Sequence, residues 1–285
     1  MTVIWHNLYL PFRKEDASNM EDPSGKGEKS LHGETIAESL RDSLIEQGYI
    51  LYDPFGLIPG AAYADSVKLF VAPASSGWVR VLISPENQLL PAIMESMSKD
   101  QLCLSLSFDE SAMHVTVYKD GQEAELNALQ PYLKVGFTVD DLTNAMQIQG
   151  EATNISGDTF PMGVLPDDLQ SAAQTLNPKH IDRMFVKLMK KVNRQLSDTD
   201  ENQAREVLNK RINWQSTGGQ QVSQFVDCLT LPENWNKPEY VTLRDAFQRH
   251  RHRQRNPHGH LFPGDTEAME AVPNALDFLP VYGGK

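Results

Sequence analysis

The densest concentration of chemically capable side chains in this sequence lies between residues 250 and 260. These eleven residues hold four of the chain's eight histidines and three arginines, and Arg249 adds a fourth arginine at the edge. Imidazole groups bind metals and transfer protons, whereas guanidinium groups bind phosphates and carboxylates. The segment therefore offers metal chemistry, phosphate binding or the purely electrostatic role of a helix end.

A metal site needs two or three imidazoles or carboxylates on one side at close range. On a helix, residues two apart point about 200° from each other, so His250 and His252 cannot share an ion there. His258 and His260 flank a glycine in an expected extended loop, where both can face one ion, and Asp265 is a candidate third ligand. A metal-dependent hydrolase that uses residues 250–260 is therefore one functional alternative.

A second alternative is nucleic-acid or phosphate binding through residues 249–255. The net charge of −12 makes nucleic acid an unfavourable partner, because that function needs a large segregated basic face. The simpler interpretation places Arg249, Arg251 and Arg253 in the last turns of a helix, where positive charge complements the helix dipole. We expect an unbroken helix through Arg255, which would direct these cations to different sides and leave no reactive centre.

Other signs of catalysis are sparse. The chain has no Gly-x-Ser-x-Gly elbow and no His-Glu-x-x-His pair, and no cofactor is expected. Cys103 and Cys228 lie in apolar surroundings that are typical of inert buried thiols. His114 lies on the strand predicted next to Cys103 and could approach it, but a packed thiol near a surface imidazole is the simpler interpretation.

The pattern of apolar residues predicts an α+β fold. Residues 102–108 and 113–117 alternate apolar and polar positions with the period of two that is typical of half-buried strands, and residues 34–47 show a helical period. Beyond residue 136, helical periodicity dominates. We therefore expect a mostly antiparallel sheet with packed helices over 1–135, a helical region over 136–255, and an extended Pro-rich tail over 256–285 packed on the body.

Bulky apolar residues in the tail indicate that it is not a free segment, and a docking role for it is an alternative. Trp235, in the loop between two prolines, is the tryptophan best placed for an interface. The residues expected to contact a partner are Trp235, Arg249, Arg251, Arg253 and Phe262.

The favoured function is that of a non-catalytic protein-binding module. An acidic body favours partners of basic character through long-range steering. No apolar run approaches the roughly 18 residues that span a bilayer, and the N-terminal residues lack the features of a secretory signal. We therefore expect a cytoplasmic protein that does not interact with membranes.

Overall fold

The computed structural model describes residues 3–12, 26–56, 63, 65–85, 91–148, 212–260 and 264–285. Contacts group Met1–Ile148 and Trp214–Lys285 into one compact unit, and Gln149–Asn213 into a second. Almost all of the second unit lies outside the described residues, as does the part of the expected helical region that covers 149–211. The predicted division at residues 135 and 255 stays a prediction.

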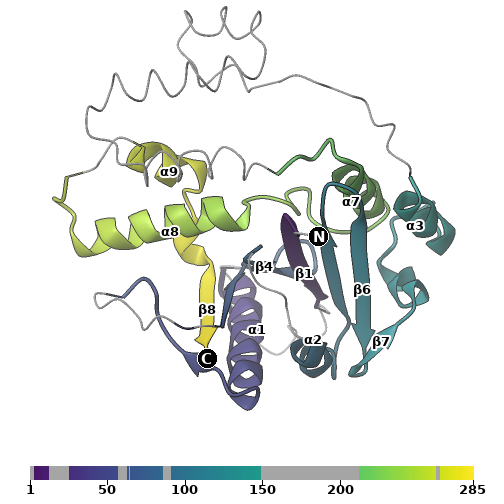
Figure 1. Cartoon of the computed structure of the whole chain (residues 1–285), viewed down its shortest axis with the longest axis horizontal. Coiled ribbons are helices and arrows are strands. Elements are labelled where there is room, and N and C mark those ends of the chain that lie inside the picture. Colours follow the sequence, from purple (N-terminus) through teal and green to yellow (C-terminus); the bar gives the residue numbers. More distant parts are fainter. Residues whose placement is uncertain are drawn as a thin grey trace, which may run out of the picture. The chain divides into compact units, whose positions relative to one another are not determined.

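The first unit is built on an eight-stranded antiparallel sheet, which confirms the mixed α+β class (Figure 1). The strands lie in the order β2-β8-β3-β4-β1-β5-β6-β7. Their bounds are β1 Trp5–Pro11, β2 Ile50–Leu51, β3 Ser66–Val71, β4 Trp78–Ile83, β5 Cys103–Phe108, β6 Met113–Lys119, β7 Gln122–Ala124 and β8 Leu279–Gly284.

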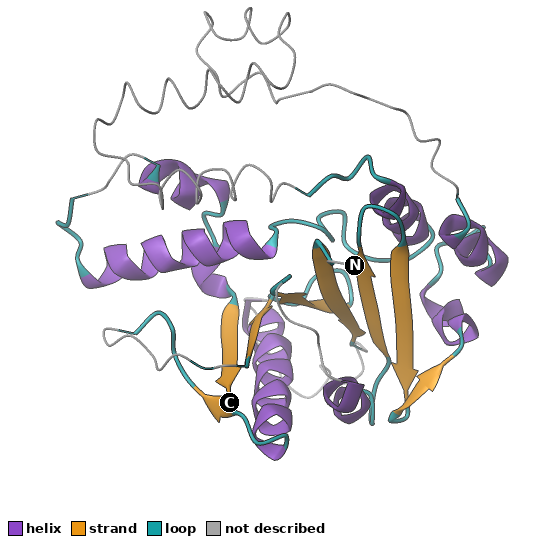
Figure 2. Cartoon of the chain, in the orientation of Figure 1, coloured by secondary structure: helices purple, strands orange, loops and turns teal. Residues whose placement is uncertain are grey.

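Helices pack against the strands, as Figure 2 shows by colour. The α-helices are α1 Lys26–Glu46, α2 Pro91–Met97, α3 Val139–Met146, α7 Thr217–Asp227, α8 Tyr240–Arg255 and α9 Asp265–Ala271, and the 3-10 helices are η2 Leu126–Tyr132 and η4 Ala275–Asp277. None of the helices in the described part is long and apolar enough to cross a membrane.

Two apolar clusters explain why the sheet is covered on both sides. One cluster joins α1 and α2 to the strand residues that alternate toward them, including Leu8, Leu69 and Val81. The other joins the face of α8 that carries Leu243 and Phe247 to the opposite side of the strands. Strand β5 is buried along its whole length, and α7 packs against it. The expectation of a half-buried strand there is corrected.

The end of the chain is part of the sheet. Strand β8 lies between β2 and β3, with Leu69 opposite Val281, and α9 precedes it. The sequence predicts an extended tail over the surface. The tail forms a strand instead because Val281 and Tyr282 bury their side chains on opposite faces of the sheet.

Helix α8 carries the cationic stretch identified in the sequence. It runs from Tyr240 to Arg255, which confirms the predicted helix through that residue. Its buried face, with Tyr240, Leu243, Ala246 and Phe247, fixes the rotation of the helix on the sheet. The remaining faces, which hold the arginines and histidines, therefore have defined directions.

Candidate functional site: a basic pocket on helix α8

Some of the histidines and arginines on α8 are directed to other parts of the fold. The ring of His250 lies with Nε2 at 3.3 Å from the Met269 carbonyl and 3.2 Å from the Val272 carbonyl, which ties α8 to the α9 segment beside it (Figure 1). Arg253 donates from Nη1 to the carbonyl of Gly259 at 3.0 Å. These side chains contribute to packing and lie outside the pocket described next.

Arg251 has two partners of its own. Its Nη2 lies 3.3 Å from Asp53 Oδ2, and its guanidinium carbon lies 5.8 Å from the centre of the Phe247 ring. A guanidinium over an aromatic face gains a cation–π attraction. Arg251 thus links α8 to the segment after strand β2 through an ion pair.

Three other groups of the same helix do converge. Arg249, His252 and Arg255 recur at intervals of three residues, which places them within about 120° of one face. With the Gln248 side chain they line a pocket of about 380 Å³. The other lining residues are Pro54, Phe55, Gly56, His260 and Asp265. The expectation that all side chains of the stretch point in different directions is therefore corrected for this face. The interval of three residues between Arg249, His252 and Arg255 was the sequence signal that could have revealed the shared face.

One wall of the pocket is an ion pair. Arg249 donates from Nε to Asp265 Oδ1 at 2.7 Å and from Nη1 to the Asp245 carbonyl at 3.0 Å. The Asp265 side chain keeps only 19% of its surface exposed. Asp265, a candidate metal ligand, is thus the carboxylate partner of an arginine.

The predicted metal ligands do not form a cluster. His260 lines the pocket but His258 does not, and both side chains are exposed. Throughout the described ranges, no group of three or more histidine, cysteine, aspartate or glutamate side chains is arranged to hold a metal ion. The geometry therefore gives the metal prediction no support.

The rest of the pocket wall offers unused donors. Within the part of the chain that the structure describes, the side chains of Gln248, His252 and Arg255 form no hydrogen bond or ion pair. All three are exposed. With Arg249 balanced by Asp265, the Arg255 guanidinium is a positive charge without a counter-ion among these residues.

Trp235 lies in an aromatic cluster. Its ring is half-buried and meets Trp5 at 5.6 Å and Trp214 at 5.4 Å, both edge to face. Its carbonyl accepts hydrogen bonds from Tyr9 Oη and Arg80 Nη1, each at 2.7 Å. The loop tryptophan is thus held by packing on the sheet. Phe262, the other aromatic residue expected at an interface, lies outside the described residues.

Arg80 is a buried cation that the sequence did not reveal. It also donates to the carbonyls of Asn234 at 3.3 Å and Lys237 at 2.6 Å, so one guanidinium holds three carbonyls of the loop. Burial lowers the pKa of Arg80 from its ordinary value. In the sequence, the only sign of this role is an arginine within the apolar residues of strand β4.

The paired thiol and imidazole considered in the sequence do not meet. Cys103 lies opposite Tyr118 and is fully buried, and burial raises the pKa of its thiol to about 12. His114 lies opposite Ser107, four residues along the same strand from Cys103. A protonated thiol without a base is no nucleophile.

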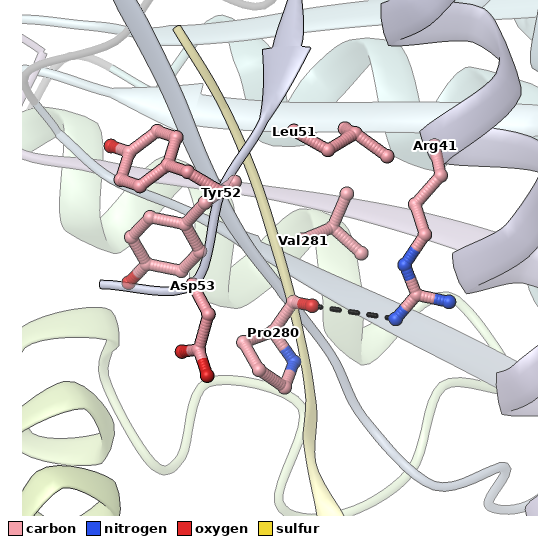
Figure 3. A pocket seen from close by; sticks show the side chains of 7 residues that line it. Arg41, Leu51, Tyr52, Asp53, Pro280 and Val281 are labelled. Carbon is pink, nitrogen blue, oxygen red and sulfur yellow. Dashed lines mark hydrogen bonds between the residues drawn. The ribbon is translucent and has the colours of Figure 1, made fainter. Parts of the chain in front are cut away.

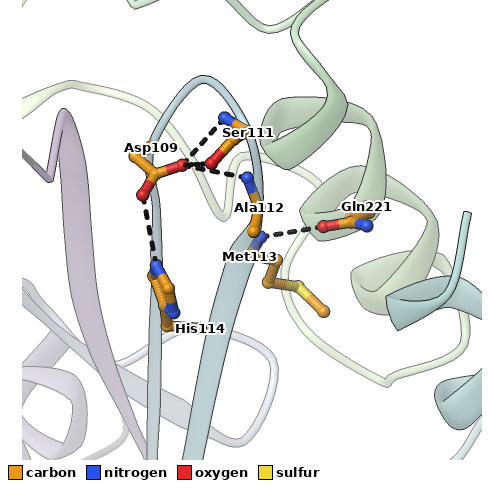
Figure 4. A network of polar contacts seen from close by, with 6 residues as sticks. All are labelled: Asp109, Ser111, Ala112, Met113, His114 and Gln221. Atoms are coloured by element: carbon orange, nitrogen blue, oxygen red, sulfur yellow. Dashed lines mark hydrogen bonds and ion pairs between the residues drawn. The ribbon is translucent and has the colours of Figure 1, made fainter. Parts of the chain in front are cut away.

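His114 belongs to the polar turn between β5 and β6 instead (Figure 4). Asp109 Oδ1 accepts from the Ser111 amide and hydroxyl and from the Ala112 amide, and Oδ2 lies 3.4 Å from His114 Nε2. The Ser111 hydroxyl is the main cause that lowers the pKa of Asp109 to about 2. Gln221 on α7 bonds to the amide of Met113, so this network joins the turn to a helix.

A second, smaller hollow of about 210 Å³ lies beside strand β8 (Figure 3). Its walls are mostly strand residues, and the Arg41 guanidinium there donates to the Pro280 carbonyl at 3.5 Å. Asp53 is its carboxylate and already faces Arg251. This hollow offers fewer free polar groups than the pocket on α8.

Comparison with protein-family models, with curated protein sequences and with solved structures gives no match to this chain.

Proposed function

We propose that this chain is a non-catalytic binding protein whose partner protein inserts an anionic group into the pocket on α8. Arg255 supplies the positive charge of that contact, and His252 and Gln248 supply further polar groups. The proposal keeps the protein-binding function expected from the sequence. It changes the expected character of the partner at the contact from basic to acidic.

One observation carries the proposal: Gln248, His252 and Arg255 line one cavity, and their donors are unused by the described residues. Charge-assisted hydrogen bonds to a carboxylate or phosphate are about twice as strong as neutral ones. The chain as a whole carries a net charge of −12, so the positive charge of Arg255 in this pocket is opposite in sign to that of the molecule.

The metal-dependent hydrolase remains a prediction with its own test. Stoichiometric zinc or manganese in the purified chain, lost in a His258→Ala variant, would support it. The nucleic-acid hypothesis loses two of its proposed contact residues, because Arg251 pairs with Asp53 and Arg253 donates to the Gly259 carbonyl. A gel shift that responds to Arg255→Gln would favour nucleic acid over an acidic protein segment.

Peptide retention tests the proposal. The immobilised full chain is exposed to decapeptide pools with random flanks and either two central glutamates or two central glutamines. We expect the glutamate pool to be retained at least about fivefold more, because a charge-assisted contact contributes roughly 1 kcal/mol or more.

Two variants give the proposal its control. Arg255→Gln should remove the preference for the glutamate pool. Arg244→Gln should keep it, because Arg244 lies on the same helix but outside the pocket and pairs with Asp245 at 2.8 Å. If Arg255→Gln retained the anionic peptides as well as the parent chain, the pocket would not be the binding site.

A further inference from the structure

From the donors in the pocket we infer that its ligand is a phosphate monoester on a side chain of the partner protein. The inference rests on the proposed function and narrows it to one chemical class. A phosphorylated side chain presents three terminal oxygens and a charge of roughly −1.5 to −2 near neutral pH. A carboxylate presents two oxygens and a single charge.

The supply of hydrogen-bond donors favours the phosphate. A guanidinium carries five N–H donors, and those of Arg255 are unused within the described residues. His252 adds a ring nitrogen and Gln248 adds an amide group with two N–H donors. Arg255 alone could satisfy the two oxygens of a carboxylate, whereas all three side chains together match three phosphate oxygens.

The ion pair between Arg249 and Asp265 supports the same reading. Arg249 donates from Nε to the Asp265 carboxylate at 2.7 Å. The chain therefore already supplies a carboxylate to this arginine. The remaining part of the pocket has Arg255 and two imidazoles, those of His252 and His260, around the cavity. We infer that an incoming phosphate contacts Arg255 and His252 while Asp265 stays paired with Arg249.

The exposure of the pocket points to a phosphate on a macromolecule. Sites for small molecules bury roughly 70–90% of the ligand. Here the side chains of Gln248, His252, Arg255 and His260 are themselves exposed, so a ligand in this hollow stays open to solvent along these side chains. Affinity for the rest of the ligand must then come from the surface around the pocket, as in binding of a phosphorylated peptide by arginine clusters.

Matched peptide pools test this inference on the full chain. Three pools of decapeptides share random flanks and carry phosphoserine, glutamate or serine at the centre, and inorganic phosphate serves as competitor. We expect at least about tenfold more retention of the phosphoserine pool than of the glutamate pool. We also expect Arg255→Gln and His252→Ala to reduce this ratio, with Arg244→Gln unchanged as the matched control.

Each other outcome has a defined meaning. Equal retention of phosphoserine and glutamate pools would overturn the inference and leave the proposed function standing. Equal retention of all three pools would contradict both. If inorganic phosphate alone bound as tightly as the best phosphoserine peptide, the ligand would be a free phosphate compound, and the assignment to a phosphorylated protein would be wrong.

Discussion

At the scale of single residues, His6 shows how burial changes a group that the sequence presents as ordinary. Its Nε2 lies 2.9 Å from the Ser105 hydroxyl. Burial lowers the pKa of His6 from 6.5 to about 4, because the charged imidazolium loses its hydration. The folded chain therefore holds this ring neutral at pH values where the unfolded chain protonates it.

This difference predicts a loss of stability in acid. The contribution of His6 is fully present above pH 6.5 and is lost as the pH falls toward 4, by roughly 3 kcal/mol in total. In a His6→Gln variant, the free energy of unfolding should vary less with pH across that window, by up to about 1.4 kcal/mol per pH unit. Denaturant unfolding at several pH values measures this, and identical slopes in both proteins would refute it.

The pocket shows what residue spacing can and cannot predict. The interval of three residues from Arg249 to Arg255 is visible in the sequence, and it follows from helix geometry alone that these side chains share a face. The contributions of Pro54 and His260 depend on where a turn and a loop pack against α8. Such long-range contacts leave no periodic signal.

At the scale of elements, the loop 232–238 depends on one guanidinium beneath it. Arg80 donates to the carbonyls of Asn234, Trp235 and Lys237. Replacing Arg80 with methionine keeps similar volume but leaves those carbonyls without this donor. We expect a loss of about 2–3 kcal/mol in the free energy of unfolding.

Arg80→Lys should fall between the parent and Arg80→Met, because an ammonium keeps the charge but lacks the planar fork. Denaturant unfolding followed by tryptophan fluorescence measures the loss, since the ring of Trp235 packs against Trp5 and Trp214. A methionine variant as stable as the parent would show that the loop is held by packing alone.

Helix α7 meets the turn between β5 and β6 at Gly218. A Cβ atom at this position would overlap the Asp109 carbonyl and lie 2.7 Å from the Ala112 carbonyl. Gly218→Ala should therefore lower the free energy of unfolding by about 1–3 kcal/mol. Gly33→Ala is the control. Its Cβ would lie 3.4 Å from the Ala72 carbonyl, and alanine has a higher helix propensity than glycine at this position in α1. Equal melting temperatures for the two variants would contradict the close approach.

The elements differ in how well local sequence predicts them. The strands of the β5–β6 hairpin and helix α8 follow from period and length. The insertion of β8 between β2 and β3 does not, because it joins residues more than 200 positions apart. Local patterns also cannot show that a sheet is covered on both faces, which is why β5 is more deeply buried than its alternation predicts.

At the scale of the whole molecule, a positive pocket on an acidic chain gives binding an unusual salt dependence. The net charge of −12 repels an anionic partner at long range, whereas Arg255 attracts it only at contact. The Debye length falls from about 30 Å at 0.01 M salt to about 8 Å at 0.15 M. The association rate of an anionic peptide should therefore rise across this range, as stopped-flow fluorescence can measure. A falling rate would indicate that a larger basic surface guides the partner.

The most direct test of the central claim observes Arg255 itself. In a ¹⁵N-labelled full chain, the side-chain Nε–H resonance of Arg255 is assigned by its absence from Arg255→Gln, and that of Arg244 is assigned in the same way. Addition of the best-retained anionic peptide should move the Arg255 resonance in a saturable manner and leave the Arg244 resonance in place. Saturable binding of that peptide with no change at Arg255 would contradict the assignment of the pocket as the binding site.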